Sequence, residues 1–246
     1  MLERNAVEQV HRVEDARVNW YLVEEAGRVL VVDTGHPGSW RSLRRSLQTL
    51  GYGFADIEAI VLTHGHFDHM GFARRAQSEL GLDVWAPAGD SAVQHPWRYS
   101  HEDSRLPYLR HPYFVRTLAE MTAFGALGVR GLAQTRTFRD GDRLDLPGHP
   151  KAIATPGHSE GHCSLVFEDR GALLAGDAFV MVDPYTGRPG PCLVAGAATA
   201  DSRQALSSVE LLAGLSATTA LTGHGAPWRG AIGEAATRVR EAAAAR

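Results

Sequence analysis

Cysteine is nearly absent from this chain, which has two in 246 residues. Cys163 and Cys192 do not form a CxxC pair, and two cysteines are too few for a disulfide framework. We expect each to be a small, partly buried side chain rather than a metal ligand. Any metal site must therefore be built from other residue types.

Long apolar runs and clustered positive charge are also missing. No run approaches the roughly 20 residues that a membrane-spanning helix needs. At the N-terminus, Glu3, Arg4, Glu8, His11 and Arg12 occupy the place of a signal-peptide hydrophobic region. The net charge is −3 with Lys and Arg spread throughout, which argues against a nucleic-acid partner. We expect a cytoplasmic protein that acts on a small molecule, with no nucleic-acid or membrane partner.

The chain does contain a regular alternation of strand and helix signals, which predicts an α/β fold in a single domain spanning 1–246. The predicted strands are 18–23, 28–32, 57–62, 82–87, 151–155, 163–167, 172–175 and 218–222. The predicted helices are 40–50, 72–80, 205–215 and a last one through 235–242. In addition, Asp140-Gly141 favours a hairpin within 138–144, and 187–191 is predicted to be a glycine and proline loop.

The segment 89–132 interrupts this alternation. It is rich in aromatic residues, histidine and proline, and Phe114, Leu118 and Met121 recur at the spacing of one amphipathic helix. An insertion of this kind between two core strands is expected to act as a lid over a site. The alternative is that its aromatic residues only pack the insertion onto the body of the protein.

The most informative stretch is Thr63-His64-Gly65-His66-Phe67-Asp68-His69-Met70-Gly71. A short apolar run precedes it, so the motif lies at the end of a strand, where alternation places His64 and His66 on the same side. Helical spacing after Phe67 places Asp68 and His69 at a helix start. Imidazole and carboxylate are the ligands that hold zinc and related metals. The stretch predicts a metal site, and half of a two-metal site.

Further candidate ligands follow other predicted strands. Polar residues framed by glycine or threonine end five of these strands, at Asp33, His64, His158, Asp177 and His224. Sites in α/β proteins collect at strand ends, where loops aim side chains at a common point. The imidazoles and carboxylates together are His64, His66, Asp68, His69, His158, Asp177 and His224. Seven ligands exceed what one zinc takes, so two metals are expected.

These motifs, in this order, resemble those of the metallo-β-lactamase-fold hydrolase superfamily across nearly the whole chain. The resemblance implies an αββα sandwich of two mixed β-sheets flanked by helices. It also implies a role for each residue: Asp33 supports the site, His64, His66 and His158 hold one metal, Asp68, His69 and His224 hold the other, and Asp177 bridges the two. The implied cofactors are two Zn²⁺, with iron or manganese as alternatives.

The chemistry that follows is hydrolysis by a hydroxide shared between two metals, with Asp68 as the catalytic residue that orients the hydroxide and carries a proton. His162, four residues after His158, is expected to support the site by packing or by contact with a ligand residue. Contact with substrate is the alternative for His162.

Departures from particular branches narrow the expected substrate. Residues 156–162 are similar to the third motif of glyoxalase II enzymes, which add a helical C-terminal domain, whereas this sequence stops about twenty residues after His224. Quorum-quenching lactonases resemble the chain in all seven ligands, yet they typically have tyrosine where Val180 stands here. We expect a small carboxylic ester, thioester or lactone. The alternatives are an iron-dependent redox enzyme of the persulfide dioxygenase kind, a phosphodiesterase, or a binding module without catalysis. The oligomeric state stays open, with a dimer among the options.

Overall fold

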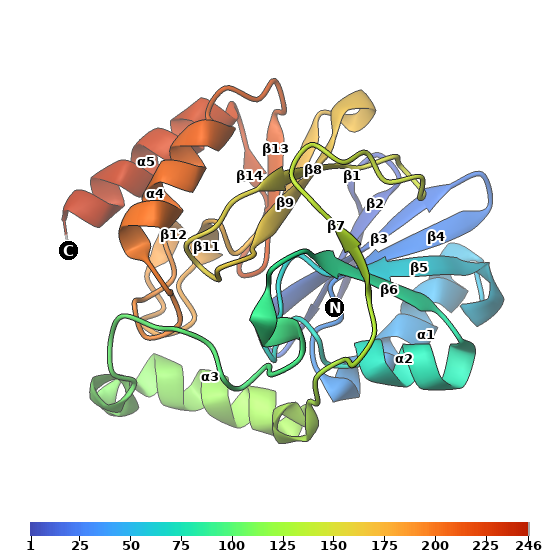
Figure 1. Cartoon of the computed structure of the whole chain (residues 1–246), viewed down its shortest axis with the longest axis horizontal. Coiled ribbons are helices and arrows are strands. Elements are labelled where there is room, and N and C mark those ends of the chain that lie inside the picture. Colours follow the sequence, from blue (N-terminus) through green and yellow to red (C-terminus); the bar gives the residue numbers. More distant parts are fainter. Residues whose placement is uncertain (246) are drawn as a thin grey trace.

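Two β-sheets face each other with helices on both outer faces in the computed structural model, which describes residues 1–245 (Figure 1). The first sheet contains, in spatial order, β1 (Leu2–Val7), β2 (Val10–Asp15), β3 (Val18–Glu25), β4 (Arg28–Val32), β5 (Ile57–Val61), β6 (Asp83–Pro87) and β7 (Arg136–Phe138). The second contains β14 (Trp228–Arg229), β13 (Thr219–Thr222), β10 (Ala172–Gly176), β9 (Cys163–Phe167) and β8 (Lys151–Ala154). The predicted αββα sandwich of mixed sheets is confirmed.

Four helices form the two outer layers, and a fifth, α3, lies in the insertion. They are α1 (Trp40–Leu50), α2 (Ala73–Leu80), α3 (Pro112–Ala123), α4 (Ser202–Leu212) and α5 (Ile232–Ala244). In Figure 1, α1 and α2 lie on one outer side of the sandwich and α4 and α5 on the other. A short pair of strands, β11 (Val180–Val182) and β12 (Pro189–Cys192), forms a separate small sheet. None of the helices within 1–245 is long and apolar enough to cross a membrane.

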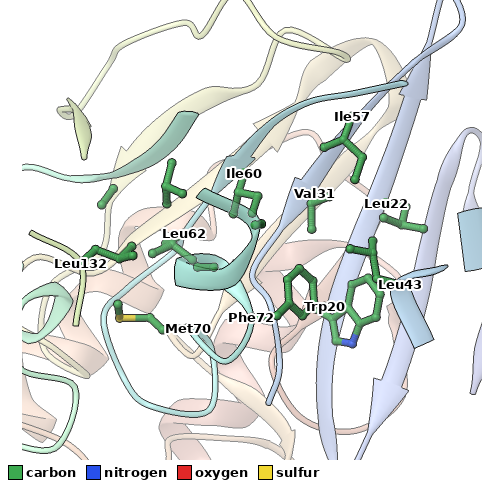
Figure 2. Packing of buried hydrophobic residues seen from close by; sticks show 14 of the residues in the cluster. Trp20, Leu22, Val31, Leu43, Ile57, Ile60, Leu62, Met70, Phe72 and Leu132 are labelled. Carbon is green, nitrogen blue, oxygen red and sulfur yellow. The ribbon is translucent and has the colours of Figure 1, made fainter. Parts of the chain in front are cut away.

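Alternation along the strands produces separate apolar layers. On β3, Leu22 packs towards α1 and α2, in the cluster that Figure 2 shows, whereas Tyr21 and Val23 face the second sheet. The Trp20 ring meets the edge of Phe72 at 5.4 Å between centroids, which joins β3 to the start of α2. A third cluster lies between the second sheet and the helices α4 and α5. Each sheet therefore packs against the other sheet on one face and against helices on the other. The loops at the strand ends extend from this packed core.

Parallel pairing brings the candidate ligands to one edge. Strands β4 and β5 are parallel, so the loops beginning at Asp33 and Thr63 leave the first sheet at the same end. Strands β10 and β13 are parallel in the second sheet, and they deliver Asp177 and His224 in the same way. The strand ends of both sheets therefore supply the site.

Three local predictions were wrong. Asp68 and His69 lie in a turn, and α2 begins only at Ala73, because the backbone N–H of Thr34 donates to the carbonyl of His69 and holds that turn against the loop after β4. Residues 138–144 do not form a hairpin, since β7 pairs in parallel with β6. The segment 187–191 is not wholly a loop, because β12 pairs with β11 there.

Candidate metal centre

All seven predicted ligands converge, from loops that are far apart in sequence. Ligand atoms lie within 4.8 Å of one another in three groups: His64, His66 and His158; His64, His69 and Asp177; and Asp68, His69 and His224. Every member is buried. The carboxylate oxygen Oδ2 of Asp177 lies 3.4 Å from Nε2 of His158, 3.6 Å from Nε2 of His69 and 3.3 Å from Nε2 of His224. Asp177 thus stands between the groups.

Asp33 and Thr63 set the orientation of two imidazoles. The carboxylate of Asp33 accepts hydrogen bonds from the backbone N–H of Thr63 and the Thr63 hydroxyl, both at 2.8 Å, and from Nδ1 of His69 at 2.9 Å. The Thr63 hydroxyl donates its single proton to Asp33. It must therefore accept the hydrogen bond from Nδ1 of His64, at 3.0 Å. In the neutral imidazoles of His64 and His69 the proton therefore lies on Nδ1, which leaves each Nε2 able to bind a metal.

The His224 loop is held by the first sheet. Nδ1 of His224 donates to the backbone carbonyl of Arg17 at 2.8 Å, so in the neutral imidazole Nε2 is also able to bind a metal. The amide of Asn19 donates to the carbonyls of Thr222 and Gly225 at 2.8 and 2.7 Å, on either side of His224. A loop of the second sheet is thus fixed by polar groups of β3, which makes the site dependent on the packing of the sheets.

His162 supports the site through a directed chain of hydrogen bonds. Its Nε2 accepts from the backbone N–H of Asp177 at 3.0 Å, so the proton sits on Nδ1 and is donated to the Thr155 hydroxyl at 2.8 Å. Thr155 in turn donates to Ser164 at 3.0 Å, because the Ser164 proton goes to the carbonyl of Ala175 at 3.1 Å. This chain positions the Asp177 backbone, and His162 is fully buried and does not line the cavity described below.

The donor atoms of the cluster fit metal ions. Within the described residues, the buried Nε2 atoms of His64, His66, His69 and His158 and the Oδ1 atom of Asp177 have no hydrogen-bond partner. Burial of this many unpaired polar atoms is costly unless something else satisfies them. Burial also lowers the pKa of His64 and His66 well below the usual range, so these imidazoles are neutral and able to ligate. Neutral imidazole nitrogens and carboxylate oxygens are a donor set for first-row divalent metals.

Comparison with known proteins agrees with this geometry. The family model of the metallo-beta-lactamase superfamily matches residues 13–224. The chain belongs to the metallo-beta-lactamase superfamily. It is 29% identical over 243 residues to the probable metallo-hydrolase YflN of Bacillus subtilis (strain 168), covering 92% of this chain and 87% of that protein. A metallo-beta-lactamase family protein of Thermus thermophilus superposes with a TM-score of 0.71 at 27% identity, over 97% of this chain and 80% of its own.

One relative with a more specific name matches a smaller part. The hydroxyacylglutathione hydrolase GloC of Haemophilus influenzae is 23% identical over 124 residues, which is 50% of either chain. Family membership and the buried His/Asp cluster together identify this chain as a metallo-hydrolase of that superfamily.

A cavity of about 260 Å³ opens beside the His/Asp cluster. Its polar end contains His66, Asp68, His158, Asp177 and His224. The insertion supplies much of the remaining wall, with Trp97, Tyr99, Arg105, Leu106, Leu109, Phe114, Thr117, Leu118 and Met121. The insertion therefore shapes the space next to the proposed ligands, while Phe67 and Trp97, stacked at 4.3 Å between centroids, also attach it to the ligand loop.

Two residues of the site, Asp90 and Tyr185, were given no role by the sequence patterns. Asp90 accepts from the backbone N–H of Gly65 at 3.2 Å and from the Ser159 hydroxyl at 2.6 Å, so it ties the His64 loop to the His158 loop. Tyr185 lines the cavity from the loop between β11 and β12. Val180, where the lactonases place tyrosine, is fully buried and does not line the cavity. A tyrosine there would overpack the core.

Proposed function

We propose that this chain is a binuclear metal-dependent hydrolase of a small carboxylic ester, thioester or lactone. The observation that carries the proposal is the convergence of bare, buried imidazole nitrogens around one carboxylate, Asp177. In the proposal, His64, His66 and His158 would hold one metal and Asp68, His69 and His224 a second, and Asp177 would be a ligand shared by both. Zinc fits this donor set best, with iron and manganese as alternatives.

The protein side of the chemistry depends on Asp68. Two bound divalent metals supply Lewis acidity and a water of lowered pKa. Asp68 is buried yet lines the cavity, and its Oδ2 lies 3.6 Å from Nε2 of His224 and 3.9 Å from Nε2 of His69. One carboxylate oxygen of Asp68 thus faces the second ligand group while the side chain borders the substrate space. We assign to Asp68 the orientation of the attacking water and the transfer of its proton to the leaving group.

The cavity supports a carbonyl substrate over a phosphodiester. Its walls beyond the ligand cluster are mostly aromatic and aliphatic, and among the described residues that line it Arg105 is the only lysine or arginine. A phosphodiester would be expected to need more positive charge around it. The name of the GloC relative, a thioester hydrolase acting on hydroxyacylglutathione, supports the thioester member of the proposed substrate class.

Elemental analysis of the purified protein, combined with a substrate panel, tests this function. The panel contains p-nitrophenyl esters, thioesters, lactones and bis-p-nitrophenyl phosphate. We expect about two zinc ions per chain, the stoichiometry of two-metal hydrolytic sites, and hydrolysis of carbonyl substrates. Iron without hydrolysis of any panel member would favour the redox alternative instead. Hydrolysis of the phosphate diester alone would favour the phosphodiesterase.

Replacing Asp33 by Asn should weaken binding of the second metal. Asparagine tolerates the left-handed backbone of this position, where φ is 58°, so the loop conformation can persist. The amide has fewer acceptor sites than the carboxylate, and His69 loses the partner that keeps its proton on Nδ1. We expect roughly 10- to 100-fold lower affinity for one of the two metals in a chelator competition titration.

The exposed Asp169→Asn variant is the matched control for that titration. Two metals bound with wild-type affinity in Asp33→Asn would refute the supporting role of Asp33.

A further inference from the structure

Arg105 lines the cavity with a guanidinium that is fixed in position but forms no ion pair within the described residues. It lies just before the short 3-10 helix Leu106–Arg110 of the insertion and lines the cavity. Its Nε donates to the carbonyl of Ala197 at 3.3 Å, and its guanidinium carbon lies 4.8 Å from the centre of the Tyr99 ring. Among residues 1–245, no carboxylate forms an ion pair with it. The two terminal amino groups are therefore available to a ligand.

Arg17 shows what a neutralised arginine looks like in the same region. It borders a neighbouring pocket that also reaches His224. Two of its nitrogens donate to the carboxylate of Glu120, at 2.7 and 3.1 Å. This bidentate pair leaves Arg17 little capacity for an external anion. Arg105 has the same chemistry without the internal partner.

A stack of rings sets the distance between Arg105 and the metal ligands. The Tyr99 ring lies against the imidazole of His66, with 3.9 Å between centroids, and also carries the Arg105 guanidinium. Arg105 is thus no farther from the His66 ring than two stacking distances. Tyr185 lines the same cavity as Tyr99 and stacks on Phe114, with 4.6 Å between ring centroids. The contact with His66 fixes Tyr99, and with it the position of the guanidinium.

We propose that Arg105 binds a carboxylate carried by the substrate, several bonds away from the scissile carbonyl. The proposal rests on the ester, thioester or lactone hydrolysis proposed above. Guanidinium and carboxylate form two parallel, charge-assisted hydrogen bonds, and the terminal amino groups of Arg105 are free for such a pair. The apolar wall from Leu118 and Met121 accommodates the hydrocarbon between the two ends.

Matched substrate pairs test this assignment in the wild type and in Arg105→Gln. On the acyl side, mono-p-nitrophenyl glutarate is compared with its neutral isostere, p-nitrophenyl 4-carbamoylbutyrate. On the leaving-group side, 4-carboxyphenyl pentanoate is compared with 4-carbamoylphenyl pentanoate. Arg110→Gln, an exposed neighbour at the end of the same 3-10 helix, is the control variant.

We expect Arg105→Gln to raise KM at least about tenfold for the carboxylate member of one pair, with KM for its amide unchanged. The pair that responds shows whether the carboxylate sits on the acyl group or on the leaving group. Metal content should equal that of the wild type, since Arg105 contacts no proposed ligand directly. Equal changes for acid and amide in both pairs, or none, would overturn the assignment.

Failure of the wild type to hydrolyse any member would count against the proposed function and not against this site. In that case the carboxylate site is tested by ligand binding. Binding of 4-phenylbutyrate and 4-phenylbutyramide is measured by quenching of tryptophan fluorescence, because Trp97 lines the same cavity. At least tenfold weaker binding of the acid to Arg105→Gln, with amide binding unchanged, supports the carboxylate site. Equal binding of the acid to both proteins refutes it.

Discussion

Replacing Asp177 by Ala is expected to abolish hydrolysis and to lower the metal content. The Asp177 carboxylate lies close to the Nε2 atoms of His158, His69 and His224, so its removal takes charge from both proposed metal sites. Burial alone would raise the pKa of Asp177, but His224 and His69 outweigh it and hold this pKa well below the usual range. A permanently charged carboxylate is thus lost. We expect kcat/KM to fall by roughly 10²- to 10³-fold or more.

The measurement combines metal analysis, kcat/KM and thermal unfolding of the variant. The fold should persist, since Asp177 belongs to none of the apolar clusters that join the layers. Asp201→Asn serves as the control, because Asp201 caps α4 through Gln204 and asparagine caps a helix equally well. Two bound metals together with full activity in Asp177→Ala would rule out the bridging role.

The sequence was informative where local geometry alone determines the outcome. Strand alternation placed His64 and His66 on one side, and both reach His158 in the structure. The apolar runs before Asp33, Thr63, Asp177 and Gly223 correctly predicted that strands deliver the loops of the site. These features depend on a period of two and on turn residues, which neighbouring residues encode.

Long-range contacts account for what the sequence did not reveal. The turn containing Asp68 and His69 replaces the expected helix start, because Thr34 bonds to the His69 carbonyl and the N–H of Gly71 donates to the carbonyl of Gly35. Strand β12 forms in a glycine- and proline-rich segment because a two-stranded edge sheet tolerates proline. The position of Arg105 depends on Ala197, 92 residues away, and no local pattern encodes such a contact.

The N-terminal strands were missed for a related reason. Residues 1–13 look polar, yet β1 and β2 extend the first sheet through backbone pairing with β3. Arg12 of β2 donates to Asn19 at 3.0 Å and to the carbonyl of Gly225 at 3.1 Å, so its charge is used inside the protein. Residues 1–13 therefore have the composition of a solvent-exposed segment although they form strands and support the His224 loop.

Gly223→Ala is expected to damage the site without removing any proposed ligand. A Cβ atom at this position would lie 2.0 Å from Oδ1 of Asp177 and 2.7 Å from Cε1 of His69. The backbone of Gly223 is not in the left-handed region, so alanine can adopt its conformation and the conflict is purely steric. Asp177 or the His224 loop must therefore move. Since a displacement of about 1 Å can cost 10²-fold in rate, we expect a loss of that order or larger in kcat/KM, together with weaker metal binding.

Gly214→Ala provides the matched control, because no atom lies within 4 Å of its Cβ position and its φ is not positive. That variant should retain activity and be equally or slightly more stable, since alanine restricts the unfolded chain. The comparison separates a steric effect on the site from the general effect of a glycine to alanine change. Wild-type metal affinity and activity in Gly223→Ala would mean that the Asp177 carboxylate is not needed in this position. Loss of both, with unfolding temperatures like those of Gly214→Ala, would tie function to the gap that glycine leaves beside Asp177.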